Sequence, residues 1–196
     1  MTDVTAQPAF ETHLPSGRSF TWEDLQSIPD EDHWRYELVD GSLLVSPSPN
    51  KFHQLCVFNV GVLLDRNCPP HLQVLTAPFD FTPQIGVVLQ PDVLVMDWER
   101  SDFNRTYVAP LLVVEVLSPG TRTTDRVLKR AVYAEHGVPS YWIMDVTDPA
   151  RPSLLALELV DRDYEVVADV HGEGTATLER PFPVTVVPSR LVDRNR

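Results

Sequence analysis

Two carboxylates stand in apolar stretches of the sequence, where a negative charge is costly to bury. Asp92 opens the run DVLVMD directly after Pro91, and Glu115 lies near the end of LLVVEVL. A buried carboxylate without a partner costs several kcal/mol or takes up a proton. One divalent cation shared by both acids would meet this need, and magnesium is the usual choice beside phosphate oxygens. Either acid could instead end its strand in solvent or pair with an arginine.

Lysine is rare in this chain. Of the 16 Lys and Arg residues, only Lys51 and Lys129 are lysine. Arginine does not readily give up its proton, whereas a lysine beside a metal can. The presence of lysine at position 129 can therefore reflect a chemical role, or it can be due to chance. Asp125, Lys129 and Tyr133 are spaced by four, which places them on one stripe of a helix. The alternative is an ordinary solvated helix with an Asp125–Lys129 pair.

The strands that would position the carboxylates are nearly continuous apolar runs at 92–97 and 111–117. Such runs are typical of central strands that are covered on both faces. Strand alternation places Glu115 on the side of Leu111 and Val113, opposite Val114 and Val116. Spacing alone leaves open whether Asp92 lies beside Glu115.

The N-terminal part of the chain carries weaker signals. Residues 1–19 have no periodicity and are interpreted as a loosely ordered arm. Thr21 and Asp24 resemble a weak capping box that opens a short helix through about Ser27. Asp40-Gly41 between two apolar runs predicts a hairpin over 36–45.

Two longer helices are predicted. One follows the SPSPN loop and ends at Pro69-Pro70. The other runs from Thr124 to His136 with Gly137 at its C-terminal cap, and its expected apolar side is Val127, Leu128, Ala131, Val132 and Ala134. Further strands are expected at about 73–82, 87–89, 141–145, 153–160, 164–170, 175–179 and 183–187. This order favours a mixed sheet with helices on its faces.

Pro91-Asp92 followed after 23 residues by Glu115 resembles the PD-(D/E)XK motif of restriction-endonuclease-like proteins. The chain more specifically resembles the bacterial Uma-type restriction-endonuclease family over roughly residues 20–150. The segments that carry this resemblance are YELVDG, SPSPNKFH, QPDVLV, VVEVLSPGT, the Asp125 to Lys129 pair, Tyr133, GVPSYW and Asp145.

Two positions depart from these patterns. Leu117 stands where the basic motif has lysine, two residues after Glu115. In the family that this chain resembles, the lysine comes from the following helix, and Lys129 matches that position. Ser140 stands before Tyr141-Trp142 where the family often has glutamate, which removes a polar contact but none of the expected ligands.

The resemblance implies roles for the matching residues. Asp92, Glu115 and the backbone carbonyl of Val116 would bind Mg²⁺, with Mn²⁺ as a substitute, and Lys129 would orient or help deprotonate a water. Glu37 would be a further acid at the metal, or would pair with Arg35 or another arginine. The supporting residues are Gln90, His53, Asp125 and Tyr133. Gln90 would orient Asp92 or a water, or is a plain strand-edge amide. His53 would contact phosphate or water, or is a capping or internally bonded histidine.

The charge of the chain opposes a simple nucleic-acid interaction. There are 28 acidic and 16 basic residues, which give a net charge of -12. Contacts to phosphate need cations, so non-specific binding to nucleic acid is disfavoured. Arg122, Arg126, Lys129 and Arg130 form a local basic patch beside Glu115, where a phosphodiester would have to lie.

The sequence predicts one α/β domain over 20–196, with a three-layer α/β/α restriction-endonuclease-like core and a central mixed sheet. We expect a metal-dependent endonuclease that hydrolyses DNA, cytoplasmic and homodimeric, with no signal peptide and no membrane partner. Two alternatives remain open. One is a catalytically idle dimeric binding or regulatory module, and the other is a metal-dependent hydrolase of a small phosphorylated substrate.

Overall fold

A six-stranded mixed sheet forms the centre of the molecule. The computed structural model describes residues 19–28, 34–118 and 124–194, without the side chains of Thr124 and Asp125. The strand order is β10-β9-β8-β7-β5-β3, and β7 and β8 are the one parallel pair of this sheet. The strands are β3 (Leu72–Thr76), β5 (Val93–Asp97), β7 (Leu112–Leu117), β8 (Ser140–Asp145), β9 (Ser153–Val160) and β10 (Asp163–His171).

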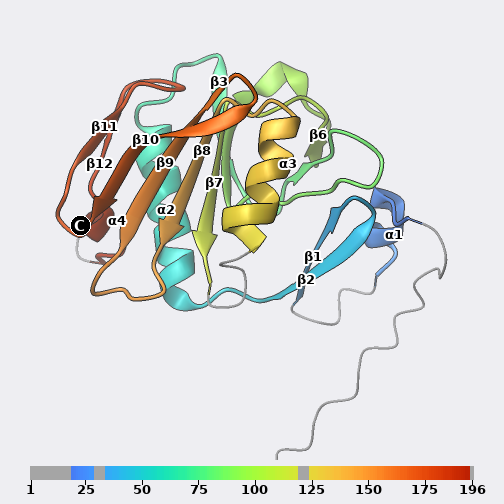
Figure 1. Ribbon diagram of the computed structural model, residues 1–196, viewed down its shortest axis with the longest axis horizontal. Coiled ribbons are helices and arrows are strands. Elements are labelled where there is room, and N and C mark those ends of the chain that lie inside the picture. Colours follow the sequence, from blue (N-terminus) through green and yellow to red (C-terminus); the bar gives the residue numbers. More distant parts are fainter. Residues whose placement is uncertain (1–18, 29–33, 119–123, 195–196) are drawn as a thin grey trace, which may run out of the picture.

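Helices cover both faces of this sheet. Helix α2 (Lys51–Asp65) lies behind it in the view of Figure 1. The π-helical segment η2 (Thr124–Lys129) continues into α3 (Arg130–Glu135), which lies in front. The η2–α3 segment is the crossover that joins the parallel strands β7 and β8, as a parallel connection requires. The predicted mixed α/β fold with a central mixed sheet is confirmed.

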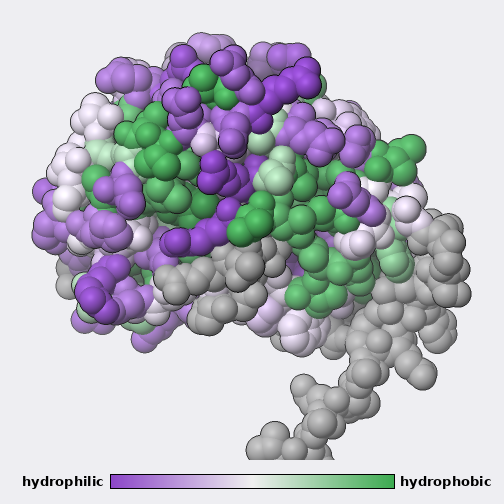
Figure 2. Space-filling view, viewed as in Figure 1, coloured by the Kyte–Doolittle hydropathy of each residue, from purple (hydrophilic) through white to green (hydrophobic). Residues whose placement is uncertain are grey.

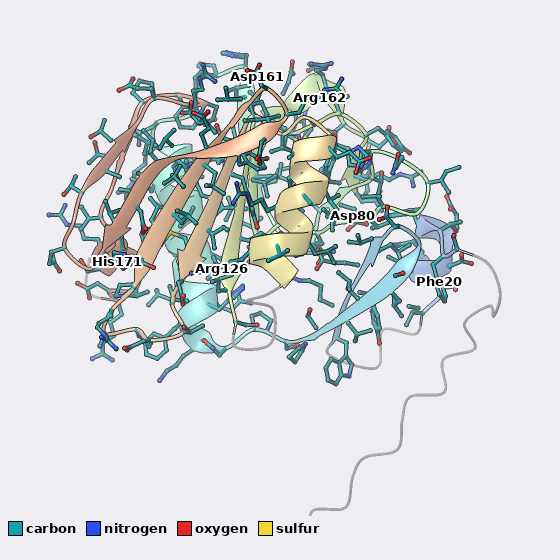
Figure 3. The ribbon with its side chains drawn as sticks, viewed as in Figure 1. Phe20, Asp80, Arg126, Asp161, Arg162 and His171 are labelled. Atoms are coloured by element: carbon teal, nitrogen blue, oxygen red, sulfur yellow. The ribbon has the colours of Figure 1, made fainter. Side chains whose placement is uncertain are left out.

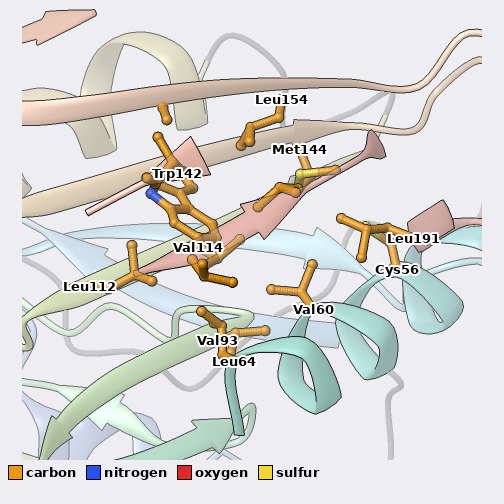
Figure 4. Packing of buried hydrophobic residues seen from close by; sticks show 14 of the residues in the cluster. Cys56, Val60, Leu64, Val93, Leu112, Val114, Trp142, Met144, Leu154 and Leu191 are labelled. Carbon is orange, nitrogen blue, oxygen red and sulfur yellow. The ribbon is translucent and has the colours of Figure 1, made fainter. Parts of the chain in front are cut away.

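The larger hydrophobic core lies between the sheet and α2. Even-numbered residues of β7 and β8 point to this face, so alternation divides the side chains of these strands between two cores. Figure 4 shows Cys56, Val60 and Leu64 of α2 packed near Val93, Val114 and Met144. The short strands β11 (Ala176–Leu178) and β12 (Val184–Val186) and helix α4 (Pro188–Leu191) add to the same core.

The second core lies between the sheet and α3. Val113 and Leu117 of β7 and Ile143 of β8 face it, and α3 contributes Val132 and Tyr133. Glu115 shares this face because it alternates with Val113 and Leu117. The prediction for the side on which Glu115 lies is therefore consistent with the two core clusters.

The hairpin is formed by β1 (Trp34–Val39) and β2 (Ser42–Pro47). Asp40 and Gly41 connect the strands with positive φ angles of 50° and 72°, which is the conformation that Asp-Gly favours in tight hairpins. Leu38 forms a bridge to Val88 and so ties the hairpin to the rest of the fold. Before the hairpin, the capping box of Thr21 and Asp24 opens helix α1 (Trp22–Gln26).

The structure corrects the predicted strand over 73–82. Strand β3 ends at Thr76, and Pro78 follows, which has no N–H to donate. Asp80 and Phe81 form a separate strand, β4, which pairs in parallel with β6 (Arg105–Thr106). In place of the strand expected at 87–89, Val88 and Leu89 form isolated bridges to Leu38 and Phe81. The short 3₁₀ helix η1 (Trp98–Arg100) follows β5.

The predicted apolar side of the second helix is wrong for three residues. Val127 is 66% exposed, and Leu128 and Ala131 are also exposed, whereas Val132 is buried. A π-helical turn takes more residues than an α-helical turn, so the side chains before Arg130 do not continue the face of α3. Among the described residues, no helix is both long and apolar enough to cross a membrane.

The same valine-to-alanine change should lower the free energy of unfolding much more at a buried position than at an exposed one. Val114→Ala removes two methyl groups from a fully buried strand position and should lower the free energy of unfolding by about 2 kcal/mol. Val166→Ala on the edge strand, at a side chain that is 60% exposed, should change it by less than about 0.5 kcal/mol. Urea denaturation of both variants measures the difference, and equal losses would contradict this assignment of the core.

Candidate functional site

Strand register brings the two predicted carboxylates together. Val93 of β5 pairs with Val114 of the antiparallel strand β7. Asp92 precedes Val93 and Glu115 follows Val114, so the two acids meet at the same end of adjacent strands. The backbone N–H of Val116 donates to Asp92 Oδ2 at 2.7 Å, which fixes the Asp92 side chain against β7. Spacing alone left open whether Asp92 lies beside Glu115, and the antiparallel pairing of β5 and β7 places them side by side.

Asp92 is almost completely buried and is held by donors from three elements. Arg35 Nη2 of β1 lies 2.8 Å from Oδ1, and His53 Nε2 of α2 lies 3.2 Å from Oδ2. His53 is brought there by the N-terminal turn of α2, which the Asn50 side chain caps. The pairing of Asp92 with an arginine was one of the alternatives that the sequence left open. In the structure Asp92 both pairs with Arg35 and lies beside Glu115.

The surroundings of Asp92 keep it ionised. Burial alone would raise the pKa of the Asp92 carboxyl, but the His53 hydrogen bond, the Arg35 charge and the Val116 N–H together hold this pKa well below its ordinary value. Burial would likewise lower the pKa of Arg35, yet the nearby carboxylates, Asp92 foremost, raise it above its ordinary value. The pair therefore remains charged on both sides at neutral pH.

Lys129 joins the other two carboxylates of the site. Its Nζ lies 2.9 Å from Glu37 Oε2 and 3.0 Å from Glu115 Oε1, and the lysine side chain is 3% exposed. Tyr133 Oη donates to the same Glu115 oxygen at 2.7 Å. Burial and the negative charge of Glu115 raise the pKa of Tyr133 well above its ordinary value, so its phenol stays a hydrogen-bond donor.

These side chains line a small pocket of about 20 Å³, close to the space of one water-sized sphere. Three carboxylate residues, Glu37, Asp92 and Glu115, face it together with two basic residues, Arg35 and Lys129, so the acidic residues outnumber these two basic ones by one. The lining consists of Arg35, Glu37, Ser46, Pro47, Pro49, His53, Asp92, Glu115, Val116, Ser118 and Lys129.

The donor chemistry of this pocket fits a magnesium ion. Within the described ranges, no three side chains of His, Cys, Asp or Glu are grouped so that they could hold a metal. Magnesium, however, usually binds through one or two carboxylates and keeps several of its waters. Asp92 accepts hydrogen bonds from three donors, and a carboxylate offers about four acceptor positions. Asp92 therefore keeps an acceptor position of the kind that this ion uses, and Glu115 and Val116 line the same pocket.

The structure gives definite contacts for the supporting residues. Glu37 pairs with Lys129 instead of an arginine. Gln90 does not orient Asp92 with its side chain, because its amide Nε2 donates to Asp80 at 3.0 Å, while its backbone N–H donates to Glu37 at 2.8 Å. His53 contacts Asp92. Asn50 is the N-cap of α2, so His53 is not the cap of this helix.

Two arginines of the expected basic patch, Arg126 and Arg130, contact residues away from the small pocket. Arg126 Nη2 lies 3.3 Å from Asp145, at the end of β8, and Figure 3 shows it beside the lower end of the sheet. Arg130 contacts Asp163 and the carbonyl of Tyr164. Neither arginine lines the small pocket. Arg122 lies outside the described residues, as does the side chain of Asp125.

Arg35 is the residue of this site that the sequence analysis missed as a functional candidate. It lies two residues before Glu37 on β1, and strand alternation places both side chains on the same face. This spacing is the signal that could have found it. Its guanidinium also donates to the carbonyl of Gln90 at 3.4 Å, so it connects β1 to the segment that precedes Asp92.

A family model described as "Putative restriction endonuclease", Uma2, matches residues 22–189. The chain belongs to this family. The resemblance noted from the short motifs is thereby confirmed, and membership in the Uma2 family supports a nuclease. No curated protein matches the chain.

A solved structure supports the fold of this Uma2 family member. It is the crystal structure of a protein from Anabaena variabilis, described as a putative nuclease that belongs to DUF820. The likeness has a TM-score of 0.63 at 18% sequence identity and covers 81% of this chain and 89% of that chain. At this identity the likeness shows a shared fold.

The depressed pKa of Asp92 makes the stability of the protein depend on pH. Because the pKa is lower in the folded than in the unfolded chain, the contribution of Asp92 is complete above about pH 4 and is lost as the pH falls further. Asp92→Asn should lower the free energy of unfolding by about 3 kcal/mol at pH 7, since Arg35 loses its buried partner. The difference from wild type should shrink toward pH 3. Denaturation across this range, with the exposed Asp65→Asn as control, would contradict the assignment if the difference stayed constant.

Proposed function

We propose that this protein is a metal-dependent endonuclease that hydrolyses phosphodiester bonds of DNA. The observation that carries the proposal is the meeting of Asp92 and Glu115 at the ends of β5 and β7, with the Lys129 ammonium 3.0 Å from Glu115. The family match supports the nuclease class. Metal dependence and the DNA substrate are inferred from the chemistry of the pocket.

Asp92, Glu115 and the carbonyl of Val116 are the proposed ligands of Mg²⁺ or Mn²⁺. The ion would supply Lewis-acid polarisation of the phosphate and a lower pKa for a bound water. As an ammonium, Lys129 would orient the attacking water and stabilise the negative charge that develops on phosphate, and as a neutral amine it would help to deprotonate that water. Glu37 holds the Lys129 ammonium from the hairpin side and so directs it toward Glu115.

Arg35 and His53 complete the proposed machinery on the other side of Asp92. Their hydrogen bonds keep the Asp92 carboxylate ionised and in one orientation. The Nδ1 atom of His53 is buried and has no hydrogen-bond partner among the described residues. Because Nε2–H donates to Asp92, Nδ1 of the neutral ring is an acceptor, and it is available to the O–H group of a water that enters the pocket. Tyr133 orients Glu115 by donating to one of its oxygens.

A homodimer is part of the proposal, because cleavage of both strands of a duplex calls for two sites. Sedimentation velocity of the purified protein tests this directly. A mass of one chain, 22.1 kDa, under the conditions of cleavage would remove the dimer from the proposal.

A second candidate function is a catalytically idle binding module of the same fold. It is favoured by one observation, namely that Lys129 already forms ion pairs with both Glu37 and Glu115 while Arg35 and His53 engage Asp92. An idle module would neither cleave nucleic acid nor bind magnesium. Titration calorimetry with magnesium distinguishes the two, because the nuclease requires binding that is lost in the Asp92 and Glu115 variants.

The two lysines of the chain provide a matched pair of variants for the nuclease. Lys129→Met should lower the rate of plasmid cleavage with magnesium by at least about a hundredfold, because general-base assistance and charge stabilisation each contribute that much. Lys51→Met changes an exposed lysine that lies over the Phe52 ring and should leave the rate unchanged. Asp92→Asn and Glu115→Gln should likewise abolish cleavage, as should chelation of the metal.

Supercoiled plasmid, single-stranded DNA and RNA are the substrates to compare. Cleavage that survives Asp92→Asn, Glu115→Gln and Lys129→Met would overturn the site. Hydrolysis of a small phosphate ester, with no cleavage of any nucleic acid, would favour a hydrolase of small phosphorylated substrates instead.

A further inference from the structure

Strand β1 separates two pockets. Its alternate residues Arg35 and Glu37 line the small pocket of Asp92 and Glu115. The residues between and before them, Trp34 and Tyr36, point to the opposite face and line a second pocket of about 430 Å³. The rest of that lining is Leu25, Gln26, Ile28, Pro78, Asp80 and Gln90. This volume lies in the range of sites for small planar molecules.

Two residues of this second pocket, Asp80 and Gln90, offer it hydrogen-bond acceptors. Asp80 is 8% exposed, and its carboxylate accepts from Trp22 Nε1 at 2.7 Å and from Gln90 Nε2 at 3.0 Å. Figure 3 shows it between α3 and the hairpin. In the part of the chain that the structure describes, no lysine, arginine or histidine forms an ion pair with Asp80. A buried carboxylate held only by neutral donors keeps acceptor capacity for an N–H group of a ligand. The Gln90 amide oxygen is a second acceptor.

The other wall of the pocket is aromatic. Trp34 is 48% exposed although it begins a strand, and Tyr36 follows it on the same face. The hydropathy view shows hydrophobic residues over the part of the molecule that holds the hairpin and α3 (Figure 2). Exposed aromatic rings of this kind are the surfaces on which unpaired bases stack, and stacking does not require phosphate contacts. It therefore suits a chain with a net charge of -12.

Gln90 connects the two pockets. Its side chain holds Asp80, its backbone N–H donates to Glu37 at 2.8 Å, and its carbonyl accepts from Arg35 at 3.4 Å. Two residues later in the chain stands Asp92. A ligand group on Asp80 and Gln90 is thus one strand away from the proposed site of phosphodiester hydrolysis.

We propose that the pocket of Trp34 and Asp80 binds an unpaired nucleobase that carries an exocyclic amine, within the nucleic acid cut at Asp92 and Glu115. The base stacks on Trp34, and its amine donates to Asp80 and Gln90. Cytosine and adenine offer such an amine, whereas thymine presents a carbonyl oxygen at that place. The inference rests on the proposed nuclease function and defines its substrate as single-stranded or as a duplex with a base turned out of the stack.

Binding of labelled single-stranded oligonucleotides tests this proposal by fluorescence anisotropy. The measurements use the Glu115→Gln protein, so that the DNA remains intact, with magnesium present. Oligo(dC) should bind about tenfold more tightly than oligo(dT) of the same length. Trp34→Leu should weaken oligo(dC) binding about tenfold, and Trp34→Phe should restore most of it. Trp98→Leu is the matched control, because Trp98 is 58% exposed but does not line the pocket.

Asp80→Asn provides an independent measurement, since it should reduce the preference for oligo(dC) over oligo(dT) more than it reduces oligo(dT) binding. Thermal melting of each variant verifies folding. Cleavage rates measured without the Glu115→Gln change separate the two levels of the proposal. Unchanged cleavage and binding in Trp34→Leu, with no preference between the oligonucleotides, would reject the base pocket and leave the nuclease standing. Absence of any cleavage or binding would reject both. A changed sedimentation coefficient in Trp34→Leu, with unchanged DNA binding, would show a subunit interface instead.

Discussion

The ion pairs of Lys129 with Glu37 and Glu115 are the interaction on which the architecture of the site depends. Glu37 comes from the hairpin, Glu115 from a central strand and Lys129 from the crossover that joins β7 to β8. A single ammonium group therefore ties three separate parts of the fold together. Removal of one partner from such a buried set leaves an uncompensated charge, which typically costs about 3–5 kcal/mol. The hairpin, which pairs with no strand of the central sheet, is thus positioned by these ion pairs, by its bridge at Leu38 and by the packing of Val39 in the core beneath α3.

Asp92 has a similar double role on the other side of the pocket. Its carboxylate joins β1 through Arg35, α2 through His53 and β7 through the Val116 N–H. The residues proposed for chemistry are consequently the ones that hold the elements in place. Proteins commonly balance stability against function in this manner. Here the balance is between holding a carboxylate with protein donors and leaving it able to bind a metal.

The sequence was informative wherever a local pattern determines structure. Asp40-Gly41 predicted the hairpin turn, Thr21 and Asp24 predicted the start of α1, and the alternation around Glu115 predicted its face. The resemblance also led to Lys129, which the structure places at Glu115. The contact between Asp92 and Glu115 needed the register of β5 against β7, which depends on distant pairing.

Other features could not be derived because they depend on tertiary context. Val127 was expected to be buried on a regular helix, but a π-helical turn changes which side chains face the sheet. The amide of Gln90 reaches Asp80, ten residues earlier in the chain, through the β4 segment that the sequence assigned to one long strand. Arg35 was weighed only as a partner of Glu37, because its spacing from Glu37 places both on one face of β1 but does not show that this face meets Asp92.

The move of the lysine from the strand to the crossover has a consequence for the strand itself. Leu117 occupies the place that lysine holds in the basic PD-(D/E)XK pattern, and it is 1% exposed in the core beneath α3. Burial of a leucine contributes roughly 1.5–3 kcal/mol relative to exposure. Strand β7 thus has a core leucine at the position where the basic pattern has its lysine. At this position β7 therefore contributes packing through Leu117, while the ammonium that contacts Glu115 comes from η2 through Lys129.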